Sequence, residues 1–81
     1  MYPSIVKVVP QEDFTLLIGF DNGEGGILDM KPHLGFGAFR KIADYESFSS
    51  VRVAFDTIEW DCGVDLDPEF VYSKCQKTVV A

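Results

Sequence analysis

Residues suited to nucleophilic chemistry are scarce in this 81-residue chain, which contains two cysteines and one histidine. A Ser or Cys nucleophile needs a base within hydrogen-bond reach, and one triad can be drawn, from Cys62, His33 and Asp29. No sequence motif supports it, and such triads are recognised by geometry rather than by residue type. We therefore expect no catalytic residues and predict that the protein is not an enzyme. Cys62 and Cys75 are too far apart for a redox CxxC pair, which favours free thiols over a disulfide.

Phosphate and acid–base chemistry have weak support as well. The glycine-rich stretch 35–40 lacks the third glycine of a dinucleotide fingerprint, and the chain contains no Gly-Lys-Ser/Thr sequence. We interpret the stretch as a turn that leads into a helix, and we expect no cofactor. Carboxylates are abundant, but no pair stands out as an acid–base couple. A domain of this size also leaves little room for a deep pocket.

An acidic segment, residues 56–69, is the densest cluster of chemically active side chains. Its six acids lie between Arg52 and Lys74, where no Lys or Arg occurs: Asp56, Glu59, Asp61, Asp65, Asp67 and Glu69. Ca²⁺ prefers several such oxygens around one point, but Gly63 breaks the ligand alternation of an EF-hand and Pro68 begins a helix. We therefore expect no metal ligands. The segment is interpreted as a solvated acidic face or a docking surface for a basic protein, with cation binding as the alternative.

The overall charge excludes further classes of function. Thirteen acidic residues against seven basic ones give a formal net charge of −6 at pH 7. Nucleic-acid binders need a basic stripe to neutralise phosphates, so we expect no nucleic-acid partner. No apolar run approaches the ~20 residues of a membrane span, and the N-terminal residues lack the apolar core of a signal peptide. The sequence therefore predicts a cytoplasmic protein with no membrane partner.

Three strands are predicted at the N-terminal end of the chain. They cover residues 5–9, 14–20 and 24–30, and the second strand alternates apolar side chains on one face: Phe14, Leu16, Ile18 and Phe20. Between the second and third strands, Asn22-Gly23 predicts a type I′ turn, which joins two antiparallel strands in a tight hairpin.

Two helical segments and a second hairpin are predicted in the remaining residues. Residues 38–45 have the apolar spacing of a short helix, and residues 47–50 predict a helical turn that buries Phe48. A period-two pattern with a turn at Asp56-Thr57 then predicts an inward face made of Val51, Val53, Phe55, Ile58 and Trp60. Asp67 is a predicted N-cap before Pro68, and Leu66 and Val71 have the spacing of a hydrophobic staple for a helix over 68–75.

These elements give the order β-β-β-α-β-β-α. Antiparallel strands with helices collected on one face are typical of a two-layer α+β domain. We predict a single domain over residues 1–75 and a flexible, frayed tail over 76–81, although two valines in the tail leave room for an added strand.

The order of elements and several residues resemble a small bacterial family, the domain-of-unknown-function (DUF) family 2442. The resemblance covers nearly the whole chain, and these pieces carry it: Phe20-Asp21-Asn22-Gly23-Glu24, Asp29, Gly37 with Phe39, Asp44 with Phe48, and Val51-Arg52-Val53. Its most specific part is Thr57-Ile58-Glu59-Trp60 followed by Gly63, Asp65-Leu66 and Pro68. Asp61-Cys62 departs from the family pattern, which often has Pro and a polar residue there, and the hairpin before Thr57 looks shorter.

The resemblance implies a fold and a genetic context rather than a reaction. No catalytic residues are established for the family, so none is transferred to this chain. The chain is similar to the N-terminal domain of some small helix-turn-helix proteins. Stand-alone members are often encoded beside another small protein, and such pairs have been proposed as toxin–antitoxin-like modules.

A protein-binding surface is the function class that these observations favour. The sheet face away from the helices is expected to expose Leu17, Ile27 and Ala54, which indicates a protein partner or a homodimer. The polar side chains expected on the same face are those of Thr15, Asp29, Arg52 and Glu59. With residues near or within the acidic segment, the candidate interaction surface comprises Leu17, Ile27, Arg52, Glu59, Asp61 and Asp65. We expect a non-enzymatic protein-interaction domain, an antitoxin-like or regulatory partner of a small protein. The alternative is a small-molecule or metal-sensing domain.

Overall fold

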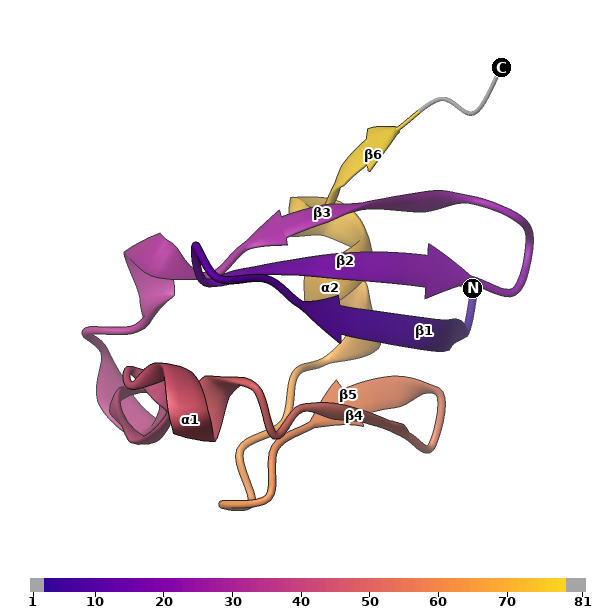
Figure 1. The fold of residues 1–81 in the computed structure, drawn as a ribbon. Helices are drawn as coiled ribbons and strands as arrows, with labels where there is room; N and C mark the ends of the chain where they lie inside the picture. The colour runs from indigo at the N-terminus through magenta and orange to yellow at the C-terminus, as the bar shows by residue number, and fades with distance from the viewer. Residues whose placement is uncertain (1–2, 79–81) are drawn as a thin grey trace.

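An antiparallel sheet with a helix across one face dominates the computed structural model, which describes residues 3–78 (Figure 1). The sheet has the order β1-β2-β3-β6, from β1 (Ile5–Pro10), β2 (Thr15–Phe20), β3 (Gly25–Asp29) and β6 (Gln76–Thr78). The helix is α2 (Pro68–Lys74), and β4 (Arg52–Ala54) and β5 (Thr57–Glu59) form a separate two-stranded hairpin beside β1. The predicted α+β class with antiparallel strands is confirmed. The strands form two sheets rather than the single sheet that was expected.

The hairpin between β2 and β3 forms where it was predicted, with a different turn. Phe20 N–H donates to Glu24 O at 2.9 Å, which leaves a three-residue loop, and Gly23 has a φ of +89°. Asn22 does not take a positive φ, so the turn is not type I′. The Asn22 side chain instead accepts a hydrogen bond from Glu24 N–H at 3.0 Å, and this contact fixes the longer loop.

The segment between β3 and β4 contains three short helices instead of the predicted helix over 38–45. They are η1 (Lys31–His33) and η2 (Gly37–Ile42), both 3₁₀ helices, and α1 (Tyr45–Phe48). Asp44 interrupts a continuous helix because its backbone is extended and its side chain accepts a hydrogen bond from Ser47 N–H, as an N-cap does. The predicted burial of Phe48 is confirmed, because its exposed fraction is 0%.

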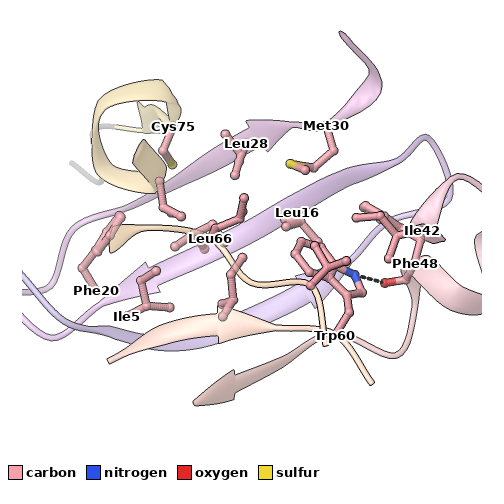
Figure 2. Packing of buried hydrophobic residues seen from close by; sticks show 14 residues of the cluster. Ile5, Leu16, Phe20, Leu28, Met30, Ile42, Phe48, Trp60, Leu66 and Cys75 are labelled. Carbon is pink, nitrogen blue, oxygen red and sulfur yellow. Dashed lines mark hydrogen bonds between the residues drawn. The ribbon is translucent and has the colours of Figure 1, made fainter. Parts of the chain in front are cut away.

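The core fills the space between the four-stranded sheet and the layer formed by α2 and the β4–β5 hairpin (Figure 2). Trp60 and Phe48 are fully buried, and Trp60 Nε1–H donates to the Phe48 carbonyl oxygen at 2.8 Å. The sheet contributes one residue of β1, alternate residues of β2 and one residue of β3, and the complete cluster is Ile5, Leu16, Ile18, Phe20, Leu28, Met30, Ile42, Phe48, Ile58, Trp60, Val64, Leu66, Val71 and Cys75.

The predicted N-cap of α2 is confirmed. Asp67 Oδ1 accepts a hydrogen bond from Glu69 N–H at 2.8 Å, Pro68 follows at the first helical position, and Leu66 and Val71 are both buried. We predict that Asp67→Ala lowers the free energy of unfolding by about 1 kcal/mol, because it removes the acceptor of an otherwise unpaired N–H group. The urea midpoint measures this loss, and Asp67→Asn is the control that keeps the acceptor. Equal midpoints for wild type and Asp67→Ala would contradict the cap.

Part of the predicted C-terminal tail is a strand. Gln76–Thr78 form β6, which pairs antiparallel with β3 in the register Ile27 with Gln76 and Gly25 with Thr78. The backbone pairing extends the sheet by one strand, so the frayed tail expected over 76–81 is wrong for its first three residues. Residues 79–81, which include both valines of the tail, lie outside the described part of the chain.

Two hydrogen-bonded carboxylates make the stability depend on acid pH. The Thr15 hydroxyl donates to the Asp13 carboxylate at 2.5 Å and lowers the pKa of Asp13 from 3.8. The Ser47 backbone N–H, at 3.0 Å, lowers the pKa of Asp44 in the same way. Because the folded groups bind protons less readily than the unfolded ones, their stabilisation is present above pH 3.8 and is lost as the pH falls through the folded pKa values.

We therefore expect the urea midpoint to drop as the pH is lowered below 3.8, the ordinary pKa of these groups. The double variant Asp13→Asn/Asp44→Asn removes both titrating groups while keeping side-chain acceptors. Its midpoint should change less with pH over the same range. Superimposable acid profiles for the two proteins would show that these hydrogen bonds contribute nothing to acid sensitivity.

Candidate interaction surface

The β4–β5 hairpin and the segment that follows it position four of the six predicted interaction residues. Arg52 pairs with Glu59 in the strand register and Val53 pairs with Ile58, so Glu59 faces the opposite side of the hairpin from the buried Ile58. Arg52 and Glu59 therefore point away from the core. An isolated antiparallel bridge between Glu59 and Asp65 adds the following segment to the edge of β5. The structure thus brings Arg52, Glu59 and Asp65 together.

Arg52 is held by two carboxylates on this surface. Its Nη2 donates to Glu59 Oε1 at 3.0 Å, and its Nη1 forms a second ion pair with Asp61 Oδ1. The Arg52 side chain is about half exposed, so each pair contributes little to stability in water. Their effect is electrostatic, because the single cation at this position is outnumbered and the surface keeps a net negative charge.

A buried scaffold fixes the acidic segment beyond β5. Trp60 N–H donates to Val64 O at 2.8 Å, and Gly63 N–H donates to Trp60 O at 2.9 Å, closing a tight turn at a Gly63 φ of +93°. Val64 and Leu66 are buried, whereas the intervening Asp65 is exposed. Alternation between anchored apolar residues and outward acids therefore presents the carboxylates on an ordered backbone.

The acids of the segment divide by role. Asp67 caps α2, and Glu59 and Asp61 pair with Arg52, so these three acids have structural partners. Asp56, Asp65 and Glu69 are exposed, and within residues 3–78 none of the three forms an ion pair. We call Arg52, Asp56, Glu59, Asp61 and Asp65 the acidic hairpin surface. Its excess charge is available to a cationic partner.

Leu17 and Ile27 lie on a different surface. They are cross-strand neighbours on β2 and β3, on the face of the sheet opposite Leu16 and Leu28, which point into the core. Ile27 is 38% exposed, and Val9 opposite Leu17 on β1 is 37% exposed. The six predicted interaction residues therefore form two groups with the core between them. The expectation that Ala54, Arg52 and Glu59 share a sheet face with Leu17 is wrong, because β4 and β5 are not part of that sheet.

Phe55 is a surface residue that the sequence pattern placed in the core. Its exposed fraction is 97%, and Val53 is also exposed, so the prediction that both face inward is wrong. The turn of the hairpin is Phe55-Asp56 rather than Asp56-Thr57, with φ values of +50° and +70°. Two consecutive positive φ values are typical of type I′ turns, which favour Asn and Gly. Asp56 suits the second position of such a turn, but Phe55 gives no local signal for the first position, so the turn begins one residue earlier than predicted.

The three residues of the conceivable nucleophilic triad are not gathered in one pocket. Asp29 and His33 line a pocket of about 380 Å³ together with Lys74. Cys62 lines another hollow, with Asp61 and residues of α1. Cys62 is exposed, whereas Cys75 is buried. Cys62 and His33 therefore line different hollows.

A search of residues 3–78 for clusters of three or more His, Cys, Asp or Glu side chains able to hold a metal ion finds none. In the same part of the chain, no helix has the length and apolar character needed to cross a membrane.

Comparison with known proteins gives one match. The model of a family described as a protein of unknown function (DUF2442) matches residues 5–77. No curated protein and no solved structure matches the chain. The matched residues include the whole acidic hairpin surface and both apolar residues of the sheet face.

Proposed function

The chain belongs to the DUF2442 family of proteins of unknown function, and on this premise we propose that it is a non-enzymatic, cytoplasmic interaction domain that binds a basic protein. The description of the family assigns no activity, so the proposal depends on the surface of this chain. The observation that supports it most is the acidic hairpin surface, where exposed carboxylates outnumber the single cation Arg52.

Charge and rigidity both favour a protein partner. Complementary charges steer two proteins together and raise their association rate. The net charge of −6 therefore favours association with a basic protein and opposes association with a nucleic acid. The backbone under the carboxylates is anchored by Trp60, Val64 and Leu66, which are buried. A pre-ordered surface loses less conformational entropy on binding than a flexible acidic tail.

The more specific form of the proposal is an antitoxin-like or regulatory partner. Relatives that stand alone are often encoded beside another small protein, as the family resemblance implies. An acidic domain that covers a basic surface on such a neighbour is physically sensible. In the complex, the charge of each protein offsets the repulsion between like charges on the other protein. In this form the domain acts by masking and requires no catalytic group of its own.

Co-expression with the small protein encoded next to it tests this form of the proposal. We expect the two proteins to elute together from a gel-filtration column at low salt and to separate, wholly or in part, as salt is raised. Elution at separate volumes at low salt would remove its main support. A version of this chain with Asp67→Asn serves as a control, because that change alters charge at the helix cap rather than on the acidic hairpin surface.

One structural observation favours the alternative, a small-molecule sensing domain. The pocket of about 380 Å³ carries opposite charges, Asp29 and Lys74, beside His33 and the apolar Ile27. Such a lining suits a small zwitterion. A panel of free amino acids that raised the thermal midpoint of wild type but not of Asp29→Asn would favour this alternative, as would a change in Trp60 fluorescence.

A further inference from the structure

We propose that Phe55 is the apolar anchor of the interface with the basic partner, with its ring inserted into an apolar pocket of that protein. The inference rests on the proposed function and adds the contact that would carry most of the affinity. Interfaces commonly depend on a few aromatic anchors surrounded by charged and polar contacts that contribute less. Phe55 has the position and the exposure of such an anchor.

Exposure of Phe55 is extreme for an aromatic residue. Phe55 is 97% exposed at the tip of the β4–β5 hairpin, more than Phe36 at 70%, whereas Phe48 and Trp60 are fully buried. The ring makes no contribution to the core, so the stability of the fold gives no reason for an apolar residue here.

The backbone at Phe55 is unfavourable for its side chain. A φ of +50° is a left-handed conformation, which is rare for a bulky residue, and Asp56 continues it at +70°. Asn would satisfy the same turn more easily. Phe55 therefore exposes apolar area to water and also has a backbone conformation that is unfavourable for its residue type. Residues with strained backbone conformations concentrate at binding sites.

Two further exposed apolar residues lie on the strands next to the turn. Ile5 N–H donates to Asp56 O at 3.2 Å, which ties β1 to the turn, and the next residue, Val6, is 59% exposed. β1 also contacts β4, where Val53 is 37% exposed. Exposed apolar area on β1 and β4 therefore accompanies Phe55 at this end of the hairpin.

The charge around Phe55 selects the occupant. A second copy of the chain would bring like carboxylates together, since Asp56 adjoins the ring and the whole chain carries −6. An anionic membrane surface is opposed in the same way. A protein with an apolar pocket rimmed by Lys or Arg satisfies both the ring and the carboxylates. The partner of this surface is therefore a basic protein.

The variant Phe55→Asn separates this role from a structural one. It should keep or raise the urea midpoint, because Asn tolerates the left-handed turn, while recovery of the partner falls by about tenfold or more, as expected for loss of a buried aromatic anchor. The assay is a low-salt pull-down with the tagged full chain from the organism that encodes it, and the recovered basic protein is identified and quantified by mass spectrometry. Phe36→Asn is the matched control, since Phe36 is 70% exposed at a distant loop.

A photocrosslinker at position 55 identifies the occupant directly. Benzoylphenylalanine in place of Phe55 should form one covalent product with the same basic protein, and the same group at position 36 should not. Equal recovery of the basic protein by Phe55→Asn and wild type would overturn the anchor while leaving the proposed function intact. A covalent dimer of this chain as the sole product would overturn the choice of partner. If wild type recovers no basic protein, the anchor and the proposed function both fail.

Discussion

Truncation of Phe48 to alanine is expected to lower the free energy of unfolding by about 3–5 kcal/mol. Phe48 is fully buried, and its ring lies 5.1 Å from that of Phe14 and 6.2 Å from that of Trp60, measured between centroids. Domains of this size have total stabilities of roughly 5–15 kcal/mol, so the cavity removes a large part of the margin. Loss of the ring also loosens the segment whose carbonyl oxygen accepts from Trp60 Nε1–H.

Urea unfolding followed by fluorescence of the single tryptophan measures this change. Phe36→Ala is the matched control, because the same atoms are removed from an exposed side chain, and a surface change of this kind usually alters stability by less than about 0.5 kcal/mol. Phe48→Leu provides a milder change if Phe48→Ala does not fold. Similar midpoints for Phe48→Ala and Phe36→Ala would contradict the position of Phe48 at the centre of the core.

Neutralising the acidic hairpin surface is the second change with a large expected effect. Asp56→Asn/Asp65→Asn removes two exposed carboxylates that form no ion pair within the described residues and keeps the shape of both side chains. Because two negative charges are removed, the formal net charge changes from −6 to −4. We expect recovery of the basic partner at low salt to fall by about tenfold, mainly through a slower association rate.

The matched control removes the same charge elsewhere. Glu12→Gln/Asp29→Asn alters two exposed acids on other parts of the chain and should leave recovery close to that of wild type. The difference between the two variants should also shrink as salt is raised, because screening weakens exposed charges. An equal loss in both would show that total charge, rather than the hairpin, attracts the partner.

The strand pattern at the N-terminal end could be predicted because it is local. Leu16, Ile18 and Phe20 alternate with the pleat, and all three are buried as expected. The α2 cap was equally readable, since Asp67 and Pro68 act within one turn. Errors arose where a side chain competes with the backbone, as at Asn22, which fixes a longer loop, and at Asp44, which divides the predicted helix.

The candidate surface was predictable in composition but not in arrangement. Arg52, Glu59, Asp61 and Asp65 lie close together because the hairpin is short and its register is local. Leu17 and Ile27 were assigned to the same face as these residues. The alternating apolar patterns of the two hairpins do not indicate that β4 and β5 form a separate sheet. Phe55 was missed for a different reason. The alternating apolar pattern of the strand continues through Phe55, and only the backbone angles show that the turn begins at this residue.

A low-salt pull-down with the tagged full chain, from the organism that encodes it, tests whether the acidic hairpin surface binds a basic protein. We expect the tagged chain to recover one small basic protein in an amount nearly equal to its own, and we expect salt to release that protein. The variant Asp56→Asn/Asp65→Asn should recover much less of it. Recovery of this chain alone, or of a partner that the variant retains in full, would contradict the assignment of the acidic hairpin surface as its binding site.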